Sequence, residues 1–368
     1  MKILLTGGGT AGHLLPLLIV VEELRKRDPE AQFLFVGPKS DFNESLAAYG
    51  IEVREVEAGK WRRYLSLKNL SDLFRTLVGI DEAIFYMLKF RPDAVLSKGG
   101  FASVPAVLGA WMLHLPVLTH ESDTVPGWAN RLIGRCADKV FISFPGAGKY
   151  FVRSKVVLSG NPVRADLSAG DRARGRESFD LHEEMPTLLV FGGSQGAQHI
   201  NQFLLGVMGD VLTKYQVIHV CGANNYDELK QKVAGLPTEL KRRYRVYPYL
   251  QEEMKDAFAL SDLVVSRAGA NSLAEIIALQ KPALVIPLPS AANNHQYLNA
   301  KHFAEAGLVL MAEEKELAGG RLLDRLGELD ARRGELAAKL AEYNAGLGGK
   351  RPAEIIAEEV LKLANNLR

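Results

Sequence analysis

The feature that most constrains the fold of this chain is a strand–glycine–helix pattern that occurs twice. The first copy reads LLTGGGTAGH from Leu4 to His13, and the second reads LLVFGGSQGA from Leu188 to Ala197. Glycine lets the backbone approach a ligand closely, and the helix that follows presents unpaired N–H groups to phosphate or hydroxyl oxygens. A chain of 368 residues is long enough for two domains. We therefore expect one such domain in each half and a phosphorylated ligand held between them.

Strand-like runs alternate with helical segments in both halves, which predicts two doubly wound α/β domains with parallel sheets. The expected strands are 2–6, 32–36, 52–56, 94–97, 117–119 and 155–158 in the first half, then 187–191, 216–221, 244–247, 263–266 and 283–286 in the second. Turn residues at 159–164 predict a boundary there, giving domains 1–160 and 161–350. Residues 313–347 are rich in Ala, Leu, Arg and Glu and are expected to form solvated helix, followed by a last amphipathic helix from Pro352.

Charge and cysteine content exclude several classes of protein. The formal net charge is +2 and the pI about 8.4, without the clustered basic stripe of a nucleic-acid-binding protein. Cys136 and Cys221 lie in separate halves and show no metal-ligand or disulfide spacing, which fits a reducing cytosol. The N terminus has no signal-peptide core, and the weakly polar stretch 101–119 is interrupted by prolines, so it predicts a buried helix and then a strand.

The first glycine loop has the spacing of a dinucleotide fingerprint, Gly7-x-Gly9-x-x-Gly12. That fingerprint also needs a carboxylate at the end of the second strand to hold a ribose, and this chain has no acid there before Asp41. Nicotinamide binding is therefore disfavoured. His13 lies at the start of the following helix, where the helix dipole favours a neutral imidazole that can accept a proton. The alternative is a histidine that only hydrogen-bonds its loop.

In the second half, the segment 266–275 follows a strand and opens a helix, which offers another phosphate site. Ser272 and Glu275 have the spacing of a capping box, in which both side chains bond the helix end. The alternative is that Glu275 accepts both ribose hydroxyls of a nucleotide. A change of Glu275 to Gln would then lower nucleotide affinity and barely alter stability.

Three further segments have a structural and a functional interpretation. The amide-rich segment 293–299 suits sugar hydroxyls but also suits a turn. The segment 120–123 follows a strand and is expected to face the same ligand. The helix expected at 67–90 has an apolar face that belongs either to a core or, with the basic and aromatic flank 60–64, to an anionic bilayer surface.

Read in order, seven motifs of the chain resemble the motif set of the MurG family of bacterial glycosyltransferases. They are GGGTAGH, SKGGFASVPAVLGA, HESD, GNPVR, GGSQGA, SRAGANSLAEI and NNHQYLNA, and the resemblance covers the chain from Met1 to about Leu310. The resemblance implies a GT-B fold, with two Rossmann-like domains facing a central cleft and the C-terminal helix 351–368 packing back on the first domain. It also implies inverting transfer of GlcNAc from UDP-GlcNAc to the C4 hydroxyl of undecaprenyl-diphospho-MurNAc-pentapeptide, giving lipid II in peptidoglycan synthesis.

The resemblance assigns roles to individual residues. In the C-terminal domain it implies donor contacts to diphosphate, uracil, ribose and GlcNAc by Arg164, Ser194, Asn201, Leu250, Ala270, Asn271, Ser272, Glu275, His295, Gln296 and Asn299. In the N-terminal domain it implies that Thr10, Gly12 and Asp123 meet the donor sugar, and that Gly9, His13, Phe101 and His120 lie on the acceptor side. The chain departs from the commonest family pattern at Ala11, Asn271 and His295.

The mechanism expected from this resemblance needs a base and a positive field for the departing diphosphate. His13 is the expected base, and Arg164 and the helix starts would stabilise UDP. The chain has no Asp-x-Asp motif, so we expect no obligatory metal, with magnesium at most a stimulant. The expected location is the cytoplasmic face of the cell membrane, bound peripherally to an anionic surface, with other cell-wall synthesis or division proteins as further partners.

Four alternatives stay open. They are a related transferase with another lipid acceptor, a UDP-GlcNAc epimerase, a noncatalytic nucleotide-sugar-binding subunit and an NAD-dependent oxidoreductase.

Overall fold

The structure is a computed structural model that describes residues 1–8, 11–40, 43–59, 67–182, 184–193, 196–346 and 349–365. The chain forms two compact units, which are described one at a time. The first comprises Met1–Pro162 and Lys350–Arg368, and the second comprises Val163–Gly349. The division expected from the turn residues, after 160 and after 350, differs from this one by two residues and one residue.

The first unit is built on a seven-stranded parallel sheet in the order β3-β2-β1-β4-β5-β6-β7. The strands are β1 (Lys2–Thr6), β2 (Gln32–Gly37), β3 (Glu52–Glu55), β4 (Ala94–Ser97), β5 (Val117–Glu121), β6 (Lys139–Ile142) and β7 (Val156–Leu158). Strand β6 was not among the predicted strands. Val140 and Phe141 in it are fully buried, so the strand shows no alternation of polar and apolar residues.

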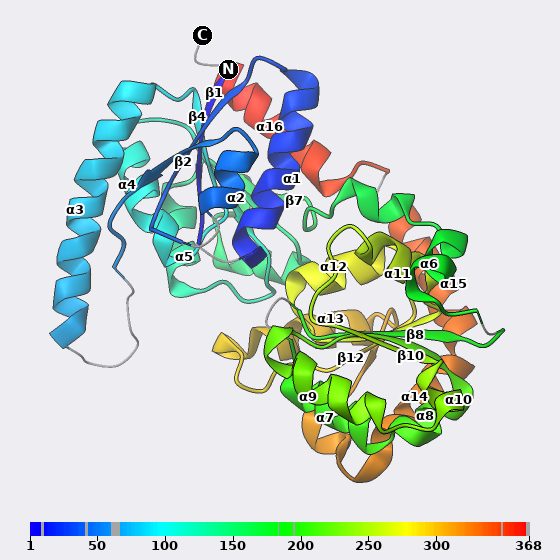
Figure 1. The fold of residues 1–368 in the computed structure, drawn as a ribbon. Coiled ribbons are helices and arrows are strands. Elements are labelled where there is room, and N and C mark those ends of the chain that lie inside the picture. The colour runs from blue at the N-terminus through cyan, green and yellow to red at the C-terminus, as the bar shows by residue number, and fades with distance from the viewer. Residues whose placement is uncertain are drawn as a thin grey trace. The chain divides into compact units, whose positions relative to one another are not determined.

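Helices cover both faces of this sheet. They are α1 (Ala11–Arg27), α2 (Asn43–Ala48), α3 (Leu67–Phe90), α4 (Val104–Met112), α5 (Trp128–Cys136) and α16 (Pro352–Asn365), with a short 3₁₀ turn η1 at Phe101–Ser103. On one face α1 and α16 lie side by side (Figure 1), and Leu17 and Val21 share a core with Ile356 and Val360. On the other face α3 packs against α4.

The second unit contains a six-stranded parallel sheet in the order β10-β9-β8-β11-β12-β13. Its strands are β8 (Thr187–Phe191), β9 (Gln216–Val220), β10 (Tyr244–Tyr247), β11 (Leu263–Ser266), β12 (Ala283–Val285) and β13 (Leu310–Met311). Its helices are α6 (Arg172–Phe179), α7 (Gln198–Gly206), α8 (Met208–Lys214), α9 (Ala223–Ala234), α10 (Thr238–Lys241), α11 (Met254–Leu260), α12 (Ala270–Ala278), α13 (His295–Glu305), α14 (Arg321–Ala331) and α15 (Arg333–Gly346). The prediction of two Rossmann-like α/β domains is confirmed.

The prediction of solvated helix in the second unit is wrong. Residues 313–347 do form helices, α14 and α15, but these are not solvated on all sides. Leu322, Leu326, Leu329 and Leu336 are fully or almost fully buried in the core of the unit. The three leucines of α14 recur at helical spacing and form an apolar stripe, and Leu336 lies on α15; the high content of charged residues around them masked this pattern.

The structure also locates the weakly polar stretch 101–119. It forms η1, α4 and the first part of β5, as the prolines predicted. Among the residues that the structure describes, no helix is long and apolar enough to cross a bilayer.

Candidate functional site

In the first unit the carboxyl ends of β1, β4 and β5 bring the predicted residue His13 beside the loops that follow β1 and β4. His13 is the third residue of α1. A Cβ added to Gly8 would lie 2.5 Å from His13 Nδ1, and one added to Gly100 would lie 3.6 Å from Nε2. The imidazole therefore lies between two glycines, and any side chain at Gly8 would displace it.

The electrostatic surroundings keep His13 neutral. Burial is the largest cause and the charge of Lys98 the next, and against the opposing charge of Asp123 they lower the pKa of His13 to about 4. The neutral ring expected from the helix start is confirmed, although burial and Lys98 are the main reasons for it. A neutral imidazole at physiological pH can accept a proton.

His120 is buried below this edge, and both of its ring nitrogens are hydrogen-bonded. Nδ1 lies 2.8 Å from Lys98 Nζ, and Nε2 lies 2.9 Å from the carbonyl oxygen of Gly160. Burial, and then the charge of Lys98, hold the pKa of His120 well below its usual value. Strand β5 extends to Glu121, so the prediction that His120 lies beyond the strand is wrong, because the strand continues for two residues.

Glu121 and Asn130 hold the loop that follows β4. Glu121 accepts hydrogen bonds from the Asp123 backbone N–H at 2.8 Å and from Asn130 Nδ2 at 2.6 Å. Asn130 Oδ1 in turn accepts from the Gly100 N–H at 2.6 Å. Burial, with the nearby charge of Asp123, raises the pKa of Glu121 to about 7. This chain of bonds fixes the loop beside His13 and the next residue, Phe101, which is 39% exposed.

Sequence reasoning missed Lys98 and Asn130 as residues of this site, and it included Glu121 only within the segment 120–123, with no role of its own. Lys98 and Glu121 lie inside motifs that carried the resemblance, but nothing in the sequence shows that a lysine is buried there. Asn130 had no signal at all, because it reaches the site only by the folding of α5 against the loop.

Of the remaining predicted residues of the first unit, two are described by the structure and two are not. Gly12 is exposed in the first turn of α1, and Asp123 is half-buried just after β5. Gly9 and Thr10, like the second-unit residue Ser194, lie outside the described residues. Roles for all of these residues in substrate binding stay predictions.

In the second unit α12 provides a helix start for an anion. Gly269 is the N-cap, with no side-chain cap, so Ala270, Asn271 and Ser272 are the first three helical residues. Their N–H groups have no partner within the helix. The capping-box interpretation of Ser272 and Glu275 is therefore wrong, because the helix begins two residues before Ser272.

Glu275 follows in the next turn of α12 and is half-buried. Burial raises its pKa to about 7, which Arg164 opposes and Asp166 reinforces. Arg164 also donates a long hydrogen bond, 3.4 Å, to the carbonyl oxygen of Gln251, the residue after Leu250. The structure thus brings the predicted residues Arg164, Leu250 and Glu275 together within this unit.

The amide-rich segment forms a tight turn and then α13. Asn293 and Asn294 have positive φ. His295 Nδ1 bonds the Ala292 carbonyl at 2.7 Å, and the Gln296 side-chain oxygen accepts from the Leu288 N–H at 3.0 Å. These bonds support the turn interpretation of the segment. Asn299 is fully buried, and sugar binding by these residues stays a prediction.

Asn201 lies on α7 behind the second glycine loop. Its Nδ2 donates to the Cys221 carbonyl at 3.0 Å, and its Oδ1 accepts from His219 Nε2 at 2.9 Å. Gly196 packs on the same carbonyl: its φ is +75°, and an added Cβ would lie 2.4 Å from that oxygen. Asn201 thus connects the strand end to the loop, and its contact with a donor stays a prediction. His219 was not predicted.

The part of the chain that the structure describes contains no cluster of three side chains suited to a metal ion. Both cysteines are free thiols. The expectation that metal is not obligatory stays a prediction.

Comparison with known proteins matches both units to domains of one protein family. Residues 3–142 match the glycosyltransferase family 28 N-terminal domain, and residues 187–356 match the C-terminal domain of that family. A protein of Lachnospira eligens named UDP-N-acetylglucosamine–N-acetylmuramyl-(pentapeptide) pyrophosphoryl-undecaprenol N-acetylglucosamine transferase is 41% identical over 90% of this chain and 92% of its own length. A protein of Clostridium perfringens with the same name is 37% identical over 96% of this chain and 97% of its own.

Solved structures support the fold. The crystal structure of Acinetobacter baumannii MurG aligns with a TM-score of 0.74 at 24% identity, covering 98% of this chain and 99% of that one. A UDP-GlcNAc 2-epimerase from Neisseria meningitidis bound to UDP-GlcNAc aligns with a TM-score of 0.64 at 15% identity, covering 98% and 100%. At these identities the likeness concerns the fold alone.

Proposed function

The chain belongs to the MurG family of N-acetylglucosamine transferases, and on that premise we propose that it transfers GlcNAc from UDP-GlcNAc to undecaprenyl-diphospho-MurNAc-pentapeptide. The observation that carries the proposal is identity of 37 to 41% over at least 90% of the chain to proteins with that activity in their names. The chain also contains the seven motifs in the order in which the family has them. The product is the disaccharide lipid used in peptidoglycan synthesis.

The donor is held by the second unit. The first turn of α12 supplies N–H donors and a positive dipole end for the diphosphate. The Glu275 carboxylate accepts hydrogen bonds from the ribose hydroxyls, and Arg164 supplies positive charge for the diphosphate. These proposed roles are supported by the proximity of Arg164 to Glu275 and to Gln251, the residue after Leu250.

The reaction is an inverting displacement. The C4 hydroxyl oxygen of the acceptor forms a bond to the anomeric carbon, the bond from that carbon to the diphosphate breaks, and UDP leaves with the electron pair. His13 takes the hydroxyl proton. Its low pKa in the free protein rises when anionic substrates bind nearby, because negative charge favours the imidazolium form. Arg164 and α12 stabilise the charge that develops on UDP.

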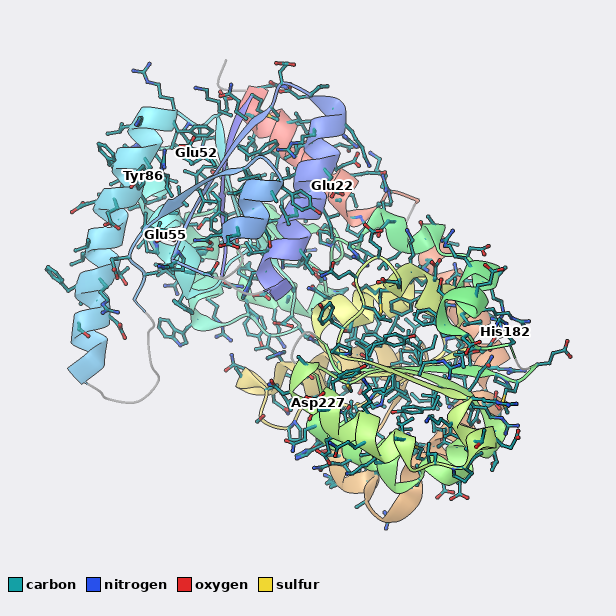
Figure 2. All side chains as sticks on the ribbon, viewed as in Figure 1. Glu22, Glu52, Glu55, Tyr86, His182 and Asp227 are labelled. Atoms are coloured by element: carbon teal, nitrogen blue, oxygen red, sulfur yellow. The ribbon has the colours of Figure 1, made fainter. Side chains whose placement is uncertain are left out.

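The acceptor carries a lipid, so the protein works at a membrane surface, and we propose α3 as the docking face. The inner side of α3 is packed: Ala83 and Met87 are buried, and Tyr86 lies over β3 (Figure 2), with the Arg54 guanidinium 6.0 Å from its ring centroid. The outer side carries large apolar side chains that are 53 to 68% exposed, namely Phe74, Leu77, Phe85 and Leu88.

An outward apolar face of this size on one helix suits the boundary between headgroups and acyl chains. The core interpretation of the helix therefore holds for its inner side only. The basic flank 60–64 lies outside the described residues. Peripheral attachment to the cytoplasmic face of an anionic membrane follows from the proposal, and other cell-wall or division proteins stay a prediction.

The test is to incubate the purified protein with UDP-GlcNAc and a short-chain polyprenyl diphosphate lipid that bears MurNAc-pentapeptide. The mass of the lipid and the release of UDP are followed together. Gain of one GlcNAc on the lipid, matched by UDP, supports the transferase. UDP release without lipid gain indicates another acceptor, and conversion of the donor to an epimer indicates the epimerase alternative. An intact donor and lipid would overturn the proposal.

A further inference from the structure

Lys98 is buried at the site, and among the residues that the structure describes no carboxylate forms a direct ion pair with it. Its side chain follows β4 and is 2% exposed, whereas lysine is almost never fully buried unless it is paired. The hydrogen bonds of its ammonium go to His120 Nδ1, at 2.8 Å, and to the Ser122 hydroxyl. Glu121 and Asp123 supply the nearby negative charge. In the proposed transfer Lys98 makes no substrate contact, and its one effect is to help lower the pKa of His13.

The bond from Lys98 determines which nitrogen of His120 carries the proton. An ammonium group has three donors and no acceptor, so His120 Nδ1 must accept. The ring proton is then on Nε2, which donates to the Gly160 carbonyl oxygen at 2.9 Å. The Ser159 hydroxyl donates to the same oxygen, also at 2.9 Å.

Gly160 occupies a special position in the first unit. The chain leaves this unit after Pro162 and returns to it at Lys350. Gly160 has a φ of +78°, and a Cβ added to it would lie 3.1 Å from Cγ of Pro352, the first residue of α16. His120 thus holds the part of the unit where the outgoing and the returning segments lie together.

We propose that Lys98 is a positioning residue: by donating to His120 Nδ1 it fixes the Nε2–H tautomer, which ties Gly160 to β5 and orders the acceptor side around residues 120–123. The proposal rests on the proposed function in one respect, that the acceptor meets this edge of the first unit. Its first half, the tautomer, concerns the free protein alone and can be measured without any substrate.

The experiment compares the wild-type protein with Lys98→Met, using ¹⁵N-detected histidine NMR and steady-state kinetics. In the wild type, His120 should show a pyrrole-like Nε2 and a pyridine-like Nδ1. In Lys98→Met the Nδ1–H tautomer should become populated, because the buried Nδ1 loses its donor. The KM for the lipid acceptor should rise about tenfold, while the KM for UDP-GlcNAc should change less than about twofold.

Two control variants separate this role from general effects of substitution. Ser122→Ala removes the other hydrogen-bond partner of Lys98 and should leave the His120 tautomer unchanged. Lys214→Met removes an exposed lysine of the second unit and should alter neither measurement.

Three results would overturn the proposal. One is an Nδ1–H tautomer of His120 in the wild type, a measurement that stands even if Lys98→Met does not fold. Another is an unchanged Nε2–H tautomer in folded Lys98→Met. The third is a changed tautomer with an unchanged acceptor KM. If the wild type does not glycosylate the lipid at all, the proposed function fails, and the tautomer measurements still decide the role of Lys98.

Discussion

The pH dependence of donor binding should report directly on Glu275. The pKa of this carboxyl is raised to about 7, chiefly by burial. If only the carboxylate binds the ribose, about one molecule in eleven is competent at pH 6 and about ten in eleven at pH 8. The Kd for UDP-GlcNAc should therefore be about tenfold higher at pH 6 than at pH 8. The donor itself does not cause this change, because its diphosphate is esterified at both ends and does not titrate near neutrality.

Glu275→Gln should remove this pH dependence and weaken binding at pH 8 by about tenfold to a hundredfold, since it loses hydrogen bonds to a charged group. It should not lower stability at pH 8. A carboxyl whose pKa is raised on folding takes up a proton in the folded state between about pH 4.5 and 7, so it costs stability as pH rises through that range.

Isothermal titration calorimetry at pH 6, 7 and 8, with a thermal melt of each variant, measures both effects. Glu228→Gln, on an exposed side chain of α9, is the matched control. A Kd for the wild type that is the same at pH 6 and pH 8, or a Glu275→Gln variant that keeps the wild-type pH dependence, would refute the reasoning.

Other expectations concern the base, the membrane face and the second glycine loop. His13→Ala should lower kcat by about 10²- to 10⁴-fold, and the wild-type kcat/KM for UDP-GlcNAc should fall in two steps as the pH is lowered, first near pH 7 as Glu275 protonates and again below about pH 5 as the His13 ring protonates near its pKa of about 4; a near-wild-type kcat in the variant would exclude His13 as the base. Phe85→Asp should reduce co-sedimentation with anionic liposomes at least about tenfold, whereas Val152→Asp, on a comparably exposed side chain, should not; equal losses would argue against α3. Gly196→Ala should lower the melting temperature and donor affinity because its Cβ meets a carbonyl oxygen, whereas Gly209→Ala, with no atom within 4 Å, should lower neither.

The fold could be predicted well because its signals are local. Each half alternates short apolar strands with helices, and glycines mark the turns where strands β1 and β8 enter helices. The failures have a common cause. Strand β6 and the leucines of α14 and α15 belong to elements buried by neighbours distant in sequence, so their periodicity is weak or masked by nearby charge.

The site could be predicted only in part. Glycine and helix-start patterns located His13 and the start of α12, because such sites depend on a few consecutive residues. The capping box failed because helix starts shift by one or two residues without a clear signal. Lys98 and Asn130 could not be found, since their roles depend on hydrogen bonds across loops that only the folded sheet brings together.

The place of α16 in the first unit has a consequence for synthesis on the ribosome. Ile356, Ala357 and Val360 fill the core beside α1, yet they are translated after the entire second unit. Domains otherwise tend to fold in the order in which they emerge. Here the second unit can fold while the first still exposes the apolar groove that α16 will cover. The nascent first unit is thus the stage at which chaperones would be needed, and truncation before Pro352 would leave it permanently incomplete.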